Sequence, residues 1–365
     1  MKITEVNATP TSLVVNPKLA IVSAAGTHPE SHYLAITIHT DEGLVGCGEA
    51  TVAPAWSGEN QGTALVLIQQ LLSTALIGAD PMQINVLVDR MDRILIGNPF
   101  TKAAVEMALL DLKGKILRLP VHMLLGGARR SIKIPLKFSI GAFSPREAVR
   151  VAAHAAGLGL RAAKVKVGLV VEEDIARVQA VRSEMGDDFR LAVDANSGWT
   201  EADAVRALPA LERLGVNALE QPLRRGDFRG CRRLRQRTHI PLMLDESVFT
   251  RQDAMEAIRA DACDFISIYP GKNGGILRSM EIAEMAASAG IECTIGSNLE
   301  MDLGTAAMLH LAVAMPKLAT TVDHDIIGPL YYLEHLTQTP IRFEDGCAVL
   351  PEGDGLGLEI QRKPG

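Results

Sequence analysis

Three acidic side chains follow three short apolar runs in the second half of the chain, and their type and spacing suggest a metal site. They are Asp194 in "AVDANSGW", Glu220 in "ALEQPL" and Asp245 in "MLDESV". If each run is a buried parallel strand, the carboxylates meet at one mouth and repel each other unless a cation lies between them. Oxygen ligands without neighbouring Cys or His favour Mg²⁺ or Mn²⁺ over zinc. Each acid could instead cap a following helix, but three in succession favour the metal.

Three lysines accompany these acids. Lys164 and Lys166 alternate with valine in "AAKVKVG", so a strand would point both ammonium groups to the same face. Lys272, in "IYPGKNGG", arrives four runs later and therefore across a barrel. A half-exposed strand or structural ion pairs would also explain Lys-Val-Lys. Together with a divalent cation, however, lysines on two sides could remove a proton α to a carboxylate, and the charge of Lys164 would lower the pKa of Lys166.

The elements that must position these residues alternate between strands and helices. From about residue 131, short apolar runs are separated by amphipathic stretches, and charged residues from Lys166 through Glu300 to Asp325 end the runs 25 to 28 residues apart. This rhythm predicts an α/β fold with a parallel (β/α)7–8 barrel of the TIM type, whose functional groups converge on one mouth. The eight runs are "IKIPLKFSI", "AAKVKVG", "FRLAVDAN", "ALEQPL", "IPLMLDES", "CDFISIYPG", "IECTIGSN" and "ATTVDHDII".

The first part of the chain has a different pattern. "KITEVNATPTSLV" and "HYLAITIHTDEGLVGCGEA" read as strands, the latter as a hairpin that turns at "DEG", with "AIVSAAGTHPES" as a polar loop between them. Helical periodicity runs from about residue 62 to 95 and through "TKAAVEMALLDLKGKIL". We predict an α+β capping domain over residues 1–125, a barrel domain over 126–330 and a C-terminal segment over 331–365.

Composition limits the partners. The chain has 365 residues, 47% of them apolar, and a net charge of −6. We expect no nucleic-acid partner because no dense Lys/Arg block is present, and no membrane partner because no charge-free run is long enough. Five scattered cysteines without a CxxC pair suit a reducing cytoplasm. A soluble cytoplasmic protein is therefore expected.

The ordered set of lysines and acids resembles the enolase superfamily, specifically the muconate-lactonizing-enzyme (muconate cycloisomerase) subgroup of the mandelate racemase/muconate lactonizing enzyme family. "KAAVEMALLDLKGKILRLPVHMLLGG" is similar to the family's linker helix into the barrel, and "SNLEMDLGTAA" to its seventh-strand segment. The resemblance implies that the C-terminal segment returns to complete the capping domain, and that the protein is a homo-oligomer acting on a small-molecule carboxylate.

The resemblance also implies roles for particular residues. Lys166 would be the base on one face of the substrate, assisted by Lys164, and Lys272 the acid or base on the other face. The loops around residues 21–32 and 52–59, including Trp56, would select the substrate. Other implied positions are Asp194, Glu220 and Asp245 as Mg²⁺ ligands, Asn196 as support for the first of them, Glu246 just behind them, and Glu300 beside the substrate carboxylate.

The implied reaction is abstraction of a proton α to a carboxylate through an enediolate, in a muconate-type cycloisomerase or, alternatively, in a racemase or epimerase of amino-acid derivatives or dipeptides. The eighth run bears on this choice. Its "GPL" is similar to the ending of lactonizing enzymes, whereas Asp323 and Asp325 are similar to the D-x-D pair that grips the α-ammonium in dipeptide epimerases. The register set by Gly328-Pro329 leaves only Asp325 matched to that pair. His324 is expected to be structural. A metal-binding barrel without turnover is disfavoured because so much buried charge is costly.

Overall fold

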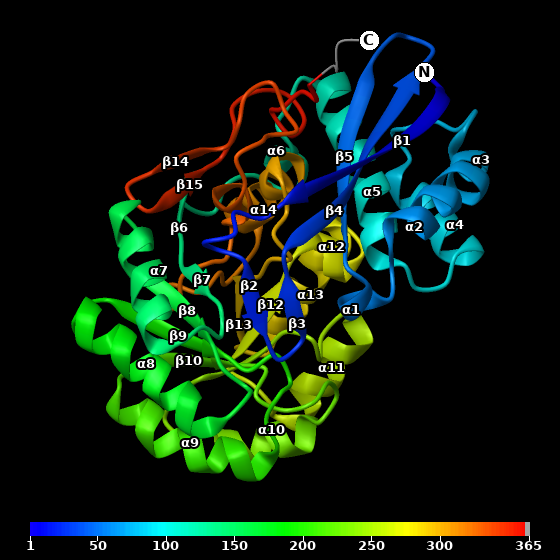
Figure 1. The fold of residues 1–365 in the computed structure, drawn as a ribbon. Helices are drawn as coiled ribbons and strands as arrows, with labels where there is room; N and C mark the ends of the chain where they lie inside the picture. Colours follow the sequence, from blue (N-terminus) through cyan, green and yellow to red (C-terminus); the bar gives the residue numbers. More distant parts are fainter. Residues whose placement is uncertain (362–365) are drawn as a thin grey trace.

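The N-terminal part is built on an antiparallel sheet. The computed structural model describes residues 1–361, in which β1 (Ile3–Val14), β4 (Glu30–Thr40) and β5 (Val45–Val52) pair in the order β1-β4-β5 (Figure 1). The predicted turn at "DEG" is confirmed: Gly43 has a φ of 79°, a conformation that glycine adopts without a steric cost. The predicted loop before β4 is partly wrong, because it contains a two-stranded hairpin of β2 (Ile21–Ser23) and β3 (Gly26–His28).

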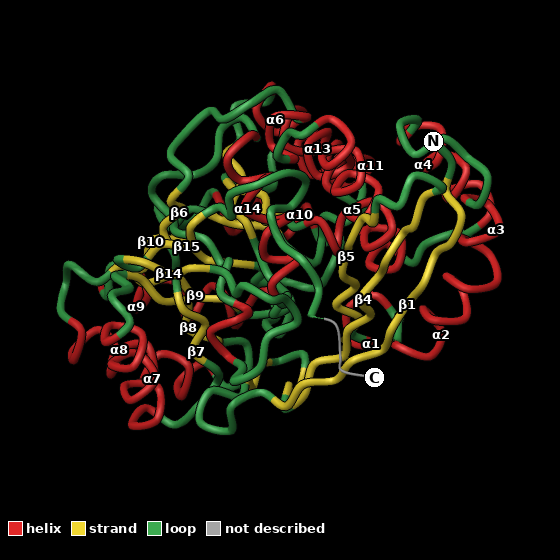
Figure 2. The backbone as a smooth tube through the Cα atoms, turned by 90° about the horizontal axis from the view of Figure 1, so that it is seen from above, coloured by secondary structure: helices red, strands yellow, loops and turns green. Residues whose placement is uncertain are grey.

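Short helices follow this sheet, and one long helix packs on it. They are α1 (Pro54–Ser57), α2 (Gln61–Leu67), the π-helix η1 (Ile68–Leu72), α3 (Ser73–Leu76), α4 (Ile84–Ile94), α5 (Pro99–Leu117) and α6 (Val121–Leu124). α5 lies directly against β5, where Gly48 allows close approach: a Cβ there would stand 2.1 Å from the Ala104 carbonyl oxygen. Figure 2 shows this sheet and its helices at one side of the molecule.

The remainder of the chain forms a curled parallel sheet covered by helices. Its seven strands, all parallel, follow one another in sequence order. Because the strands are buried by helices on one side and by one another's side chains on the other, they read as nearly continuous apolar runs. The strands are β7 (Phe138–Ile140), β8 (Ala162–Lys166), β9 (Arg190–Asp194), β10 (Val216–Glu220), β11 (Leu242–Leu244), β12 (Phe265–Ile268) and β13 (Glu292–Ile295). The helices are α7 (Pro145–Gly157), α8 (Val171–Met185), α9 (Glu201–Arg213), α10 (Phe228–Arg235), α11 (Arg251–Ala260), α12 (Pro270–Asn273), α13 (Ile276–Ser288) and α14 (Asp302–Ala314).

The eighth predicted run forms no strand of this sheet. Its backbone nevertheless bonds to the edge strand β13 and to the strand that precedes β7: the Asp325 N–H donates to the Ile295 carbonyl at 2.9 Å, and the His324 N–H donates to the carbonyl of Pro135, in β6 (Lys133–Pro135), at 3.1 Å. The segment then turns into the 3₁₀-helix η2 (Gly328–Tyr331), where Pro329 has no N–H to continue a ladder. The predicted (β/α)7–8 barrel is thus a seven-stranded sheet whose gap is bridged by residues 319–327.

The C-terminal segment returns to the N-terminal part. β14 (Arg342–Glu344) pairs with β15 (Cys347–Val349), which in turn pairs with β6 (Lys133–Pro135). Beyond them, the Leu356 N–H donates to Asp111 Oδ1 on α5 at 2.8 Å. Within the described residues, no helix combines the length and apolar character needed to cross a membrane.

Candidate active site

The two lysines of β8 point into the same cluster of carboxylates. Lys164 Nζ lies 3.0 Å from Glu220 Oε2, 2.9 Å from Asp325 Oδ2 and 3.4 Å from Asp194 Oδ2. Lys166 Nζ lies 2.6 Å from the same oxygen of Asp194. The exposed fractions of the two lysines are only 5% and 8%. Residues two apart on one strand therefore share a face, as the sequence predicts, and that face is a buried ionic cluster.

Lys272 comes from another element and contacts a different acid. It lies in the short helix α12, just after β12, and is fully buried. Its Nζ is 2.6 Å from Asp245 Oδ1 and donates to the carbonyl oxygens of Asp245 and Ser267 at 2.9 and 2.7 Å. The Tyr269 ring centroid lies 4.9 Å from the same ammonium. The ion pair with Asp245, which directly follows β11, thus holds Lys272 at the end of that strand.

The loop after β10 holds Asp245 in place through Gln221. The Gln221 Oε1 accepts the N–H groups of Asp245 and Ser247, each at 3.1 Å, and its Nε2 donates to Ser247 Oγ at 2.8 Å. The backbone of Gln221 has a φ of 33°, a strained conformation that the hydrogen bonds of its buried side-chain amide maintain. Gln221 was not predicted as a site residue, although its place directly after the buried Glu220 offered a signal.

The carboxylates of the cluster are not electrically equivalent. Burial opposes ionisation of Asp194, but Lys166 and Lys164 hold its pKa below the ordinary value. Burial, together with the charges of Asp194, Asp245 and Asp325, raises the pKa of Glu220 to about 7 despite its contact with Lys164. The pKa of Lys164 lies well above its usual value because three carboxylates outweigh the effect of burial. Around Glu220, the negative charge of the carboxylates is therefore greater than the positive charge of the neighbouring lysines.

Several oxygens beside these acids have no hydrogen-bond partner in the described part of the chain. They are Glu220 Oε1, Glu246 Oε2 and Asn196 Oδ1, all buried. Asn196 Nδ2 donates to Glu246 Oε1 at 2.9 Å, and the Asn196 N–H donates to Asp194 Oδ1 at 2.9 Å. Burial and the charges of Asp245 and Asp194 raise the pKa of Glu246 well above its usual value. Unsatisfied buried acceptors and excess negative charge are features that a hard divalent cation would satisfy.

The carboxylates are not arranged around a common centre in this structure. Within residues 1–361, no group of three or more His, Cys, Asp or Glu side chains is placed to hold a metal ion as it stands. Ammonium groups instead contact these oxygens: Lys164 lies against Glu220, Lys166 against Asp194, and Lys272 against Asp245. Binding of a cation would require these ammonium groups to move off the oxygens that they now contact.

Asp323 and Asp325, the two candidate aspartates of the eighth segment, lie at different ends of the barrel. Asp323 pairs with Arg190, at the start of β9, with N–O distances of 2.7 to 2.8 Å, and so does not join the cluster. Asp325 does join it, through Lys164. His324 is buried and neutral, since burial lowers its pKa to about 3, and its Nδ1 accepts the Ile295 N–H.

Glu300 lies beside the cluster but behind the wall of the cavity. Its carboxylate accepts the Ser297 hydroxyl at 2.6 Å and the Asn298 N–H at about 3.0 Å. Burial raises its pKa to about 7. The residues that it holds, from Ser297 to Leu299, line the cavity.

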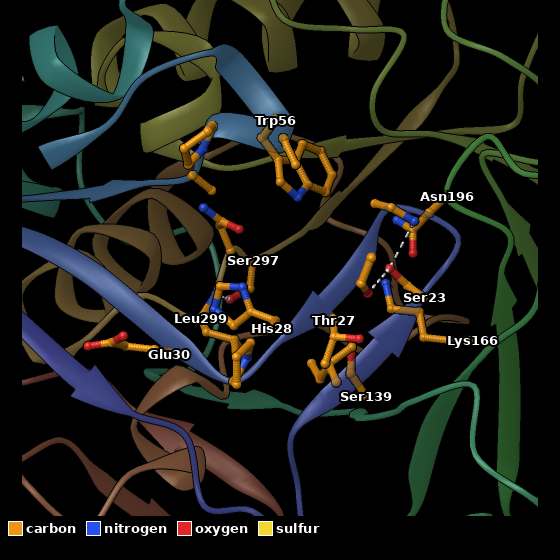
Figure 3. A pocket seen from close by; sticks show the side chains of 18 of the residues that line it. Ser23, Thr27, His28, Glu30, Trp56, Ser139, Lys166, Asn196, Ser297 and Leu299 are labelled. Atoms are coloured by element: carbon orange, nitrogen blue, oxygen red, sulfur yellow. Dashed lines mark hydrogen bonds between the residues drawn. The ribbon is translucent and has the colours of Figure 1, made fainter. Parts of the chain in front are cut away.

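A cavity of about 430 Å³ opens above Lys164 and Lys166, a size suited to a small molecule, and Lys272 does not line it. Lys164, Lys166 and Asn196 line one end of it, and most of the remaining lining comes from the segments 21–32 and 52–56, including His28 and Trp56, together with residues 297–299. Figure 3 shows Lys166 and Asn196 on the opposite side of the cavity from His28 and Leu299, with Trp56 above. His28 Nε2 bonds Ser31 Oγ at 2.5 Å, and Ser31 Oγ in turn bonds the Tyr332 hydroxyl.

One buried charged residue near the cluster was missed. Lys137, between β6 and β7, is 1% exposed, and its Nζ lies 2.9 Å from Asp325 Oδ2. The sequence contained a signal, because a lysine inside the apolar run "IPLKFSI" of a barrel strand must be buried and paired.

Comparison with known proteins gives matches over nearly the whole chain. A family model described as "Mandelate racemase / muconate lactonizing enzyme, N-terminal domain" matches residues 8–126, and one described as "Enolase C-terminal domain-like" matches residues 146–363. The chain is 33% identical over 340 residues to an N-succinyl-L-Arg/Lys racemase of Bacillus cereus, covering 93% of this chain and 90% of the relative.

Two crystal structures have the same architecture. The 2-chloromuconate cycloisomerase from Rhodococcus opacus superposes with a TM-score of 0.94 at 34% identity, covering 99% of this chain and 97% of the other. The dipeptide epimerase from Enterococcus faecalis, complexed with Mg and the dipeptide L-Leu-L-Tyr, superposes with a TM-score of 0.92 at 32% identity, covering 98% and 99%. The similar proteins thus include a racemase, a cycloisomerase and an epimerase.

Proposed function

The chain belongs to the mandelate racemase/muconate lactonizing enzyme family of the enolase superfamily and is an isomerase, and we propose that it abstracts a proton α to a carboxylate with the help of Mg²⁺ or Mn²⁺. The observation that carries this proposal is the cluster itself. Lys164 and Lys166 lie against Asp194 and Glu220 from one strand, and Lys272 lies against Asp245 from another element. Buried lysines next to acids at the carboxyl ends of barrel strands suit proton transfer.

Asp194, Glu220 and Asp245 would hold the metal, and the unpartnered oxygens of Glu220 and Asn196 support this assignment. When bound, the cation stabilises the negative charge of an enediolate formed from the substrate. Lys166, at the end of β8 and lining the cavity, would carry the proton, while Lys164 would bind the substrate carboxylate. Lys272 would face the substrate from the other side.

Among the activities of this family, we propose a muconate-type cycloisomerase. In lactonisation, the distal carboxylate adds to a double bond, and Lys166 delivers a proton to the α carbon; the reverse reaction removes that proton. The eighth segment supports an anionic substrate. Asp323 is paired with Arg190, and Asp325 is shared by Lys137 and Lys164, so neither acid is available for a substrate ammonium group.

A racemase or epimerase of an amino-acid derivative is the second candidate. It is supported by Lys272, since two lysines on separate elements suit removal of a proton from one face and its return to the other. A substrate whose amine is acylated would need no acid at the eighth segment. A relative of this chain is an N-succinyl-L-Arg/Lys racemase.

The experiment that separates these candidates follows the α-proton by NMR in D₂O with Mg²⁺. The purified protein is incubated separately with cis,cis-muconate, muconolactone, N-acyl amino acids and dipeptides, and an EDTA-treated sample is the control. Interconversion of muconate and lactone supports the cycloisomerase. Exchange with inversion supports the racemase or epimerase. Absence of exchange and conversion throughout would contradict both and favour a metal-binding barrel without turnover.

A further inference from the structure

Lys137 is the buried cation nearest to Lys164 that the proposed reaction does not use. Its Nζ donates to the Asp323 carbonyl oxygen at 2.7 Å and lies 2.9 Å from Asp325 Oδ2. Lys164 Nζ lies 2.9 Å from that same oxygen. Two ammonium groups therefore share one carboxylate, and both lysines and the acid are buried.

The sharing of Asp325 matters because Lys164 contacts only three carboxylates. Its other two, Glu220 and Asp194, are proposed metal ligands, whose charge would be engaged by the cation. Asp325 then remains as the acid facing Lys164. Without Lys137, one carboxylate would balance one ammonium and Lys164 would present little net charge to the cavity. With Lys137, the two ammonium groups and one carboxylate carry a net positive charge in a region where screening by water is weak.

Asp325 is also fixed in orientation. The Ser139 hydroxyl donates to its Oδ1 at 3.3 Å, while both lysines contact Oδ2. Ser139 and Lys164 line the cavity, whereas Asp325 and Lys137 do not. The acid is thus held behind the cavity wall, and Lys164 is the member of this group that a substrate can reach.

We propose that Lys137 is a positioning residue that offsets the charge of Asp325, so that Lys164 keeps an unbalanced positive charge for the substrate carboxylate. This inference rests on the proposed function, since it takes Lys164 as the group that binds the carboxylate. It makes the cavity selective for anionic substrates. A purely structural ion pair would instead affect folding stability and leave the affinity for a carboxylate unchanged.

The test measures binding of adipate, a six-carbon dicarboxylate without double bonds, by calorimetry in the presence of Mg²⁺. The variants are Lys137→Met, Lys137→Arg and the double variant Lys137→Met/Asp325→Asn. Lys133→Met is the matched control, because Lys133 is a half-exposed lysine of the preceding strand paired with Glu344. Unfolding temperatures are recorded for every variant, so that a loss of stability is separated from a loss of affinity.

We expect Lys137→Met to weaken adipate binding about tenfold. Lys137→Arg keeps the charge and should retain most of the affinity. The double variant removes one charge of each sign, frees Lys164 from Asp325 and should restore binding to near the wild-type value. If Lys137→Met does not fold, the double variant decides, since affinity near that of the wild type supports the proposal and a tenfold loss overturns it.

The outcomes separate this inference from the proposed function. If the wild type turns over a substrate and Lys137→Met binds adipate as tightly as the wild type, the role of Lys137 is overturned and the proposed function stands. Wild-type binding of adipate without any proton exchange or conversion, but with weaker binding in Lys137→Met, overturns the proposed function and supports Lys137. If the wild type binds no adipate and turns over no carboxylate, both are overturned.

Discussion

At the scale of single residues, Lys164 and Lys166 share a strand face but have different surroundings. Lys164 contacts three carboxylates, whereas Lys166 contacts Asp194 and stands at the strand end, where it borders the cavity. With three carboxylate partners, Lys164 is held more firmly in position than Lys166, which has one. The geometry thus favours Lys166 for proton transfer and Lys164 for binding.

Replacing either of the two lysines proposed to carry the proton should abolish turnover. We expect Lys166→Ala and Lys272→Ala each to lower kcat by roughly 10²–10⁴-fold, because each removes a group positioned for general acid–base catalysis. Steady-state kinetics with the substrate found in D₂O is the measurement. Lys18→Ala, which changes an exposed lysine outside the cavity, should leave kcat unchanged. Turnover near the wild-type rate in either active-site variant would refute the assignment of two lysines.

Metal affinity should depend on the acids of the cluster. Glu220→Gln removes a carboxylate whose Oε1 has no hydrogen-bond partner among residues 1–361, so we expect weaker Mg²⁺ binding by at least tenfold in calorimetry. Glu201→Gln, at the start of α9, removes a carboxylate that pairs with Arg233 on the surface and serves as the control. Equal Mg²⁺ affinity in both variants would argue against Glu220 as a ligand.

At the scale of elements, the parallel strands were predictable and the eighth segment was not. All seven strands are apolar runs, and β8 to β13 each end at a charged residue or within five residues of one; burial on both faces produces the apolar pattern directly. "ATTVDHDII" has the same composition, but whether it pairs as a strand depends on contacts with Ile295 and Pro135, which are distant in sequence. The pattern also could not tell that Asp323 faces Arg190, because an irregular backbone breaks the alternation of faces.

A buried acid of α5 accepts hydrogen bonds from the start of helix α13. The carboxylate of Glu106 accepts the N–H groups of Ile276 and Leu277 at 2.9 and 2.8 Å. Such a contact satisfies donors that a helix start leaves unpaired. Glu106 is 1% exposed, and burial raises its pKa from the ordinary 4.5 to about 7.

This raised pKa predicts a pH dependence of stability. The unfolded chain ionises Glu106 near pH 4.5 and the folded protein near pH 7, so its contribution to the free energy of unfolding is complete below pH 4.5 and is lost as pH rises to about 7. The loss is on the order of 3 kcal/mol. Chemical denaturation of Glu106→Gln should show a smaller fall between pH 5 and 8 than the wild type. Glu256→Gln, at an exposed position of α11, should match the wild type; identical pH profiles for Glu106→Gln and the wild type would contradict this account.

At the scale of the whole molecule, buried acids join parts of the chain that are far apart in sequence. Glu49 of β5 accepts the N–H groups of Met301 and Gly304 at the start of α14, and Asp302 accepts those of Leu336 and Ile341. None of these contacts was predictable, since a buried carboxylate in sequence does not reveal which distant N–H it meets. The resemblance to a known family supplied the return of the C-terminal segment, and the acids give its physical cause.

Asp111 is the clearest of these joints. Its two oxygens accept the Leu356 and Cys47 N–H groups, each at 2.8 Å, and Oδ2 lies 2.9 Å from Lys115 Nζ. Lys115 also pairs with Glu359 at 3.0 Å, so two ion pairs and two backbone N–H bonds connect β5, α5 and the C-terminal segment.

Removing this carboxylate should loosen the C-terminal segment and lower the stability of the whole chain. Asp111→Ala leaves two buried N–H groups without their acceptor and removes one of the two carboxylates that pair with Lys115, at a cost of about 3–5 kcal/mol in the free energy of unfolding. In Asp111→Ala, we expect hydrogen exchange under native conditions to accelerate more at Leu356 and Cys47 than at amides of the parallel sheet. The denaturation midpoint should also be lower than that of the wild type. Asp354→Ala, at an exposed position two residues before Leu356, should change neither. If exchange in Asp111→Ala increases equally at every amide, the segment unfolds only with the rest of the molecule, and Asp111 then stabilises the fold as a whole without acting as a local attachment.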